Sequence, residues 1–135
     1  MSLDADRDVG PVAASQLIFA GALIARNASG DLVKGLTATG LAGAGVAVKR
    51  CDNSGGSAGD LTVEYSRQTA RLANSGAADA IAAAEIDDVC YIVDDQTVAK
   101  TDGTGTRSPA GLIAAVDASG VWVRIDETLA ALAVA

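Results

Sequence analysis

The chain has 135 residues, half of them hydrophobic, but 29 of these are alanine and only four residues are aromatic. The length suits one domain and excludes a nucleotide-binding domain joined to a substrate domain, and the small side chains predict a thin core that oligomerisation would enlarge. A net charge of −7 without any basic run excludes nucleic acid as a partner through its phosphates and makes anionic membranes poor partners.

Residues 1–15 predict an extended N-terminal arm, and residues 16–135 predict a single β-rich domain. The first segment shows neither helical nor alternating periodicity, and Gly10-Pro11 breaks the backbone pattern. It is acidic rather than positively charged, and the longest apolar run, residues 17–25, is too short to cross a bilayer. The segment is therefore expected to be neither a signal peptide nor a membrane anchor.

From residue 16 onward, short apolar segments alternate with turn residues, which is the pattern of an all-β domain. We expect mainly antiparallel pairing in a small β-barrel or β-tulip-like domain. The predicted strands are residues 16–19, 22–26, 32–34, 45–49, 61–65, 69–72, 89–94, 97–100, 112–116 and 121–125.

Three turns between these strands have the chemistry of hairpins. Residues 27–31, 94–96 and 117–120 are rich in Asn, Asp, Ser and Gly, which accept a left-handed backbone or bond to their own main chain. Three hairpins in one small chain indicate an antiparallel meander or a barrel.

The last predicted strand has a two-residue alternation. Its apolar residues Val121, Val123 and Ile125 fall on one face, and Trp122 and Arg124 fall on the other. We expect the face of Trp122 and Arg124 to meet another subunit.

Two polar segments and two helical segments complete the prediction. Residues 51–60 and 100–109 are rich in Gly, Ser and Thr and are expected to be loops. Residues 77–86 and 126–134 have helical character, but both are too short to form stable helices alone.

The residues give little support to catalysis. The sequence has no histidine, so Ser-His-Asp and Cys-His mechanisms are impossible within this chain. A Ser-Lys mechanism would need a desolvated lysine, and Lys34, Lys49 and Lys100 all lie next to predicted turns. We therefore predict no catalytic residue and no enzyme.

Acidic and glycine-rich segments are also better explained by structure than by ligand binding. Asp87, Asp88, Asp94 and Asp95 could bind a hard cation, but they lack the order of a calcium loop and suit solvated turns. The glycine-rich residues 40–45 precede a predicted strand instead of opening a helix, unlike a phosphate loop. No metal or cofactor is predicted.

The two cysteines are expected to be reduced. Cys51 and Cys90 are separated by 38 residues and could form one disulfide by number, but no export signal supports oxidation. Two thiols without histidine are too few for a zinc site. Cys90 lies in an apolar strand, where a small buried residue fits well.

Across residues 16–126, the order of features matches a known pattern. Residues 21–26 and the hairpin through residue 33 precede a small-residue strand at 41–47, and further β segments follow at residues 68–72, 88–94, 110–114 and 119–125. In order and spacing, this resembles the head decoration (cement) proteins of tailed bacteriophages.

The resemblance implies a structural protein of the virion. Such a protein would be made in the cytoplasm of the bacterial host, assemble as a homotrimer on the outer capsid surface, bind the major capsid protein and stabilise the shell. By position, the N-terminal arm would pair with a capsid strand. The expected capsid contacts are therefore Leu3, Asp4, Arg7, Val9, Pro11 and Val12, and the expected subunit contacts are Trp122 and Arg124.

Two other classes of function stay open. The first is a ligand- or carbohydrate-binding β module of a phage or cell-surface assembly, for which only Trp122, Tyr65 and Tyr91 could supply exposed aromatic rings. The second is an enzyme that uses the aspartates with a metal ion.

Overall fold

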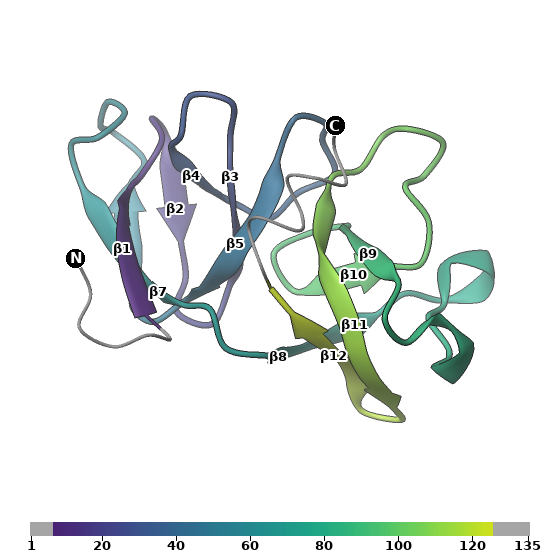
Figure 1. Cartoon of the computed structure of the whole chain (residues 1–135). Coiled ribbons are helices and arrows are strands. Elements are labelled where there is room, and N and C mark those ends of the chain that lie inside the picture. Colours follow the sequence, from purple (N-terminus) through teal and green to yellow (C-terminus); the bar gives the residue numbers. More distant parts are fainter. Residues whose placement is uncertain (1–6, 126–135) are drawn as a thin grey trace.

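The computed structural model describes residues 7–125, which form an all-β unit as the sequence predicts (Figure 1). Two short 3₁₀ turns, η1 (Ala77–Asp79) and η2 (Ala83–Glu85), are the helical elements of this part of the chain. The strands are β1 (Arg7–Pro11), β2 (Gln16–Ile18), β3 (Leu23–Arg26), β4 (Leu32–Lys34), β5 (Ala42–Ala47), β6 (Cys51–Asn53), β7 (Thr62–Ser66), β8 (Ala70–Asn74), β9 (Val89–Ile92), β10 (Thr97–Ala99), β11 (Pro109–Asp117) and β12 (Gly120–Arg124).

The first half of the chain forms an antiparallel sheet in the order β1-β7-β5-β3-β4, which we call the first sheet. Its two outer strands meet where β1 ends. Val12 forms an isolated parallel bridge with Leu32, and the N–H of Ala13 donates to the Leu32 carbonyl at 2.9 Å. Strands β2 and β6 pair beside it as a two-stranded sheet.

The second half closes into a five-stranded barrel in the order β10-β8-β12-β11-β9, so the predicted barrel is confirmed. Four of its strand pairs are antiparallel: β8 with β12, β12 with β11, β11 with β9, and β9 with β10. The closing pair is parallel and joins β10 to β8 through Thr97 and Ala73 and through Val98 and Asn74.

Strand β3 contributes to two hydrophobic cores, one on each of its faces. Leu23 and Ala25 pack into the core of the barrel, whereas Ile24 packs into the core inside the first sheet. All three side chains are completely buried. The strand therefore separates the two cores and packs against both of them. Because the cores share this strand, the described chain is one packed unit.

The three predicted hairpins are confirmed, and their turn residues bond as that chemistry requires. The Asn27 side chain accepts the N–H groups of Ser29 and Asp31, each at 3.0 Å, between β3 and β4. Asp94 accepts the N–H of Gln96 at 2.8 Å in the β9–β10 turn. In the β11–β12 turn, Asp117 accepts the N–H groups of Ser119 and Gly120.

The helix predicted at residues 77–86 is wrong, because the segment forms only η1 and η2. Between them, the Asn74 side chain bonds both the N–H and the carbonyl of Ile81, each at 2.9 Å. These bonds take the main-chain groups that a continuous helix would use. The helix predicted at residues 126–134 lies outside the described residues.

The loop predicted at residues 51–60 starts later than expected. Its first three residues form β6, which pairs with β2 in the register Ile18 to Cys51 and Gln16 to Asn53. Cys51 and Asn53 point inward and are buried. The polar Gly/Ser composition hid this strand, because its inward-facing residues include an asparagine.

The expected N-terminal arm is partly integrated into the domain. Strand β1 is extended, but it pairs antiparallel with β7 of the same chain, and Val12 is completely buried. Residues 7–15 thus belong to the packed unit, and residues 1–6 lie outside the described part. Among residues 7–125, no helix has the length and apolar character needed to cross a membrane.

Candidate functional site

The structure displays two exposed side-chain surfaces at positions that the sequence singles out. Val9 on β1 is 56% exposed, and Trp122 on β12 is 38% exposed. Strand β1 belongs to the first sheet, and strand β12 belongs to the barrel (Figure 1). We call them the β1 surface and the Trp122 surface.

Of the six expected capsid contacts, the structure exposes only part. Val9 and Pro11 alternate with inward-facing residues, and Val9 is opposite Glu64 of β7. Pro11 is half-buried, and Val12 is completely buried in the core inside the first sheet, where a partner could reach it only if the segment unfolded. Arg7 begins β1, whereas Leu3 and Asp4 lie outside the described residues.

On the Trp122 surface, the tryptophan is held by two neighbours. It is opposite Arg71 of β8, whose guanidinium carbon lies 5.9 Å from the centre of the indole ring. The indole N–H donates to the Asp117 carboxylate at 3.2 Å. This bond, together with the N–H of Ser119, holds the pKa of Asp117 below its usual range.

The alternation predicted for β12 is confirmed. Val121 and Val123 are completely buried and Ile125 is nearly so, whereas Trp122 and Arg124 face outward. Arg124 lies 3.7 Å from the carboxylate of Asp87. The two expected subunit-contact residues are therefore on one exposed face of the barrel.

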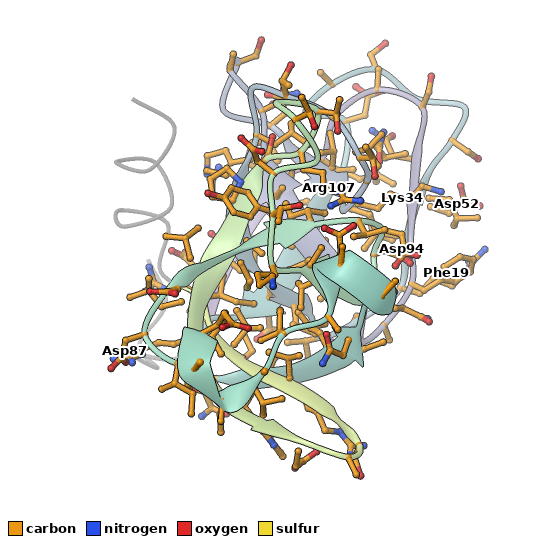
Figure 2. All side chains as sticks on the ribbon, turned by 90° about the vertical axis from the view of Figure 1, so that its right-hand side faces the viewer. Phe19, Lys34, Asp52, Asp87, Asp94 and Arg107 are labelled. Carbon is orange, nitrogen blue, oxygen red and sulfur yellow. The ribbon has the colours of Figure 1, made fainter. Side chains whose placement is uncertain are left out.

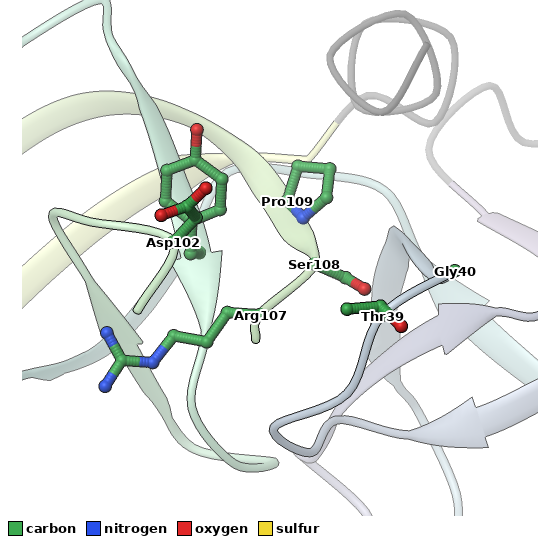
Figure 3. A pocket seen from close by; sticks show the side chains of 7 residues that line it. Thr39, Gly40, Asp102, Arg107, Ser108 and Pro109 are labelled. Carbon is green, nitrogen blue, oxygen red and sulfur yellow. The ribbon is translucent and has the colours of Figure 1, made fainter. Parts of the chain in front are cut away.

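A cavity of about 260 Å³ lies where the loop before β5 meets the barrel (Figure 3). The buried hydroxyl of Ser108 links the two parts, because it donates to the Ala38 carbonyl at 2.6 Å and accepts the N–H of Leu41 at 3.0 Å. The cavity is lined by Thr39, Gly40, Tyr91, Asp102, Arg107, Ser108 and Pro109.

Arg107 serves the fold rather than this cavity. Its guanidinium extends away from Thr39 (Figure 3), lies 3.3 Å from the Asp79 carboxylate and donates to the Thr101 carbonyl at 3.1 Å. The Thr101 hydroxyl and, less strongly, Arg107 lower the pKa of Asp79. The Ser108 hydroxyl and the Arg107 Nη1 atom thus connect separate segments, whereas the Arg107 Nε atom is buried without a hydrogen-bond partner in the described part of the chain.

The acidic residues suggested as a cation site do not come together. Asp87 and Asp94 lie on widely separated parts of the surface (Figure 2). Asp87 is next to Arg124, and Asp94 completes its own turn. Within residues 7–125, no group of three potential ligands among Cys, Asp and Glu is arranged to hold a metal ion.

The two cysteines are free thiols in different cores. Cys51 packs inside the first sheet, and Cys90 packs inside the barrel, as the sequence predicts for Cys90. Burial raises the pKa of Cys90 to about 12 and also raises the pKa of Cys51. A raised pKa opposes formation of the reactive thiolate.

Sequence reasoning missed two residues whose side chains bond the edges of the first sheet. Asp8 accepts the N–H of Val9, and Gln16 accepts the N–H of Lys34. The second contact spans 18 residues, so no local pattern could reveal it. The exposed Phe19 was also not singled out, although it ends a predicted strand beside a turn.

Comparison of the chain with protein-family models, with curated proteins and with solved structures finds no match. The structure provides an exposed aromatic and cationic surface on the barrel and a small apolar surface on β1. Both are suited to binding another macromolecule through side chains.

Proposed function

We propose that this protein is a structural protein that binds the outer surface of a phage or prophage capsid as a homotrimer and stabilises the shell, without catalysis. The resemblance of residues 16–126 to decoration proteins supplies the class. The observation that carries the proposal is the exposed Trp122, the single tryptophan of a chain poor in aromatic residues.

The Trp122 surface is suited to contact a second copy of the chain. Tryptophan and arginine are enriched in the central residues of protein interfaces. Arg71 and Asp117 already fix the ring, so binding would immobilise little additional side-chain freedom. Arg124 extends the same face and could pair with acidic groups of a neighbouring subunit.

The β1 surface is the proposed contact with the major capsid protein. Val9 and Pro11 supply an apolar strip, and the N-terminal residues that precede them, including Leu3 and Asp4, would extend the contact. The acidic balance of the chain agrees with a position on the outside of the shell, away from nucleic acid. The protein would reach this position after synthesis in the host cytoplasm.

Two measurements test the proposal. The purified protein should co-sediment, to saturation, with undecorated capsids of the phage or prophage that carries its gene. Light scattering at high protein concentration should give a trimer mass for the wild type and a lower mass for Trp122→Ala. Phe19→Ala is the matched control, because Phe19 is an aromatic residue outside the Trp122 surface and is even more exposed than Trp122, at 50% against 38%. Failure to co-sediment together with a monomer mass would contradict the proposal.

A carbohydrate- or ligand-binding module is the second candidate, and one observation favours it. A cavity of about 290 Å³ includes Arg71, the residue that stacks on Trp122. Polar side chains beside an exposed aromatic ring are a combination that binds sugars. A reproducible signal on a glycan array, abolished by Trp122→Ala, would favour this function. The cavity is lined by Gly21, Arg71, Leu72, Ala73, Gln96 and Ser119.

A further inference from the structure

The first sheet has two outer strands, β1 and β4, which are joined by the single bridge of Val12 with Leu32, whereas the barrel closes on itself along its strands. An outer strand normally presents a row of main-chain N–H and carbonyl groups that another chain can pair with. The pairing of the N-terminal arm with a capsid strand, which the resemblance implies, would use such an edge. The hydrogen bonds of β1 and β4 show which of their main-chain donors are still free to pair with another strand.

On β1, no main-chain donor is free at the outward-facing positions Val9 and Pro11. The N–H of Val12 donates to the Leu61 carbonyl of the neighbouring chain segment at 3.0 Å, and antiparallel pairing alternates the direction of successive residues. Val9 and Pro11 therefore direct their main-chain groups outward. The N–H of Val9 donates to the Asp8 carboxylate at 2.8 Å, and Pro11 has no N–H.

Asp8 is itself held in position. Its second carboxylate oxygen lies 3.8 Å from the Arg67 guanidinium, just beyond the end of β7. The next donor along the chain, the N–H of Ala13, is already bonded to Leu32. A strand that approached β1 would find no free main-chain donor at Val9, Pro11 or Ala13.

On β4, the side chain of Gln16, which comes from β2, accepts the outward-facing main-chain donor. The N–H of Gly35 donates to the Leu23 carbonyl, so the N–H of the preceding Lys34 faces outward. That N–H donates to the Gln16 side-chain oxygen at 3.0 Å. The Leu32 carbonyl, two residues earlier, accepts the N–H of Ala13.

We infer that Asp8, Pro11 and Gln16 block strand addition at both edges of the first sheet, so that this part of the chain meets copies of itself and other partners through side chains. The inference is independent of the proposed function. It excludes β1 as the strand that would pair with a capsid strand and assigns Asp8 and Gln16 the role of preventing association through sheet edges.

Three double variants test this role in solution. Asp8→Ala with Gln16→Ala removes both acceptors. Asp88→Ala with Gln96→Ala makes the same change in composition and charge at two exposed positions away from these edges. Asp8→Asn with Gln16→Glu removes the ion pair to Arg67 but retains an acceptor oxygen at both positions.

The expected result is concentration-dependent association, beyond the wild-type mass, of the first variant alone. Light scattering measures the mass, and infrared spectra show intermolecular β pairing. Wild-type behaviour of the first variant, or equal association of all three, would overturn the inference. Because no capsid is present, either result leaves the proposed function untouched.

Loss of folding in the first variant could also cause association, so a second measurement uses Asp8→Ala alone. Hydrogen exchange of the Val9 amide should be slow in the wild type and at least tenfold faster in Asp8→Ala, while core amides keep their exchange rates. An unchanged Val9 rate would overturn the role of Asp8.

Discussion

Asn53 holds Ala13 in place from an adjacent strand: its side-chain amide donates to the Ala13 carbonyl at 3.0 Å, and both residues are buried. The same amide donates to the Ser57 carbonyl at 3.0 Å and lies 3.4 Å from the Val12 carbonyl. One buried side chain thus joins the segment after β1 to the turn after β6.

Replacing Asn53 with Ala should lower the free energy of unfolding by about 1–3 kcal/mol, because buried carbonyls lose their donor. Urea denaturation monitored by circular dichroism measures the change. Gln96→Ala, an exposed position, is the control and should stay within about 0.5 kcal/mol of the wild type. Equal stability of the two variants would contradict the role of Asn53.

Gly43 is required where β5 crosses β11. A Cβ atom at this position would overlap the main-chain carbonyl of Ala110, which cannot move without shifting the barrel. Gly43→Ala should therefore destabilise the protein by about 3 kcal/mol or more. Gly55→Ala has open space around the new methyl group and should change stability by no more than about 1 kcal/mol. Thermal melts of the two variants compare these positions directly.

Neither cysteine should react in the folded protein. With a pKa of about 12, the thiolate fraction of Cys90 at pH 8 is about one in ten thousand, and the side chain is completely buried. Titration with a chromogenic disulfide reagent should show no reaction without denaturant and two thiols per chain with it. Cys51→Ser isolates Cys90. Rapid labelling of this variant when it is folded would show that the barrel opens readily.

Asp117 should control the acid response of the single tryptophan. The folded-state pKa of Asp117 is lowered, so its contribution to stability is present above the unfolded value of about 3.9 and is lost as the pH falls through the folded pKa. Trp122 fluorescence should stay constant from pH 7 to about pH 5 and change only below about pH 4. Asp117→Asn retains an acceptor but should remove this transition. An unchanged titration would mean that another group is responsible.

The sequence predicts those parts of the fold that depend on neighbouring residues. The Asn27 and Asp117 turns are confirmed because their side chains bond main-chain groups only a few residues away. The outward position of Trp122 follows from the alternation of a single strand. The all-β class follows from the repetition of such local signals.

Contacts between distant segments could not be predicted in this way. The parallel pair of β8 and β10 closes the barrel, but nothing in the sequence of either strand indicates that the two pair with each other. The pairing of β1 with β7 turned part of an expected arm into a sheet strand. At Ile81, the side chain of Asn74, seven residues earlier, bonds the main-chain groups that a helix in this alanine-rich segment would use, and Asn74 lies outside that segment.

The two-sided burial of β3 also bears on how such a chain could change during evolution. A barrel without β3 would expose the surface that Leu23 and Ala25 now cover, and a first sheet without the barrel would leave those side chains in water. Deletion or exchange of either half alone would leave apolar side chains of the other half exposed to water, which disfavours evolution of this chain by recombination of its halves.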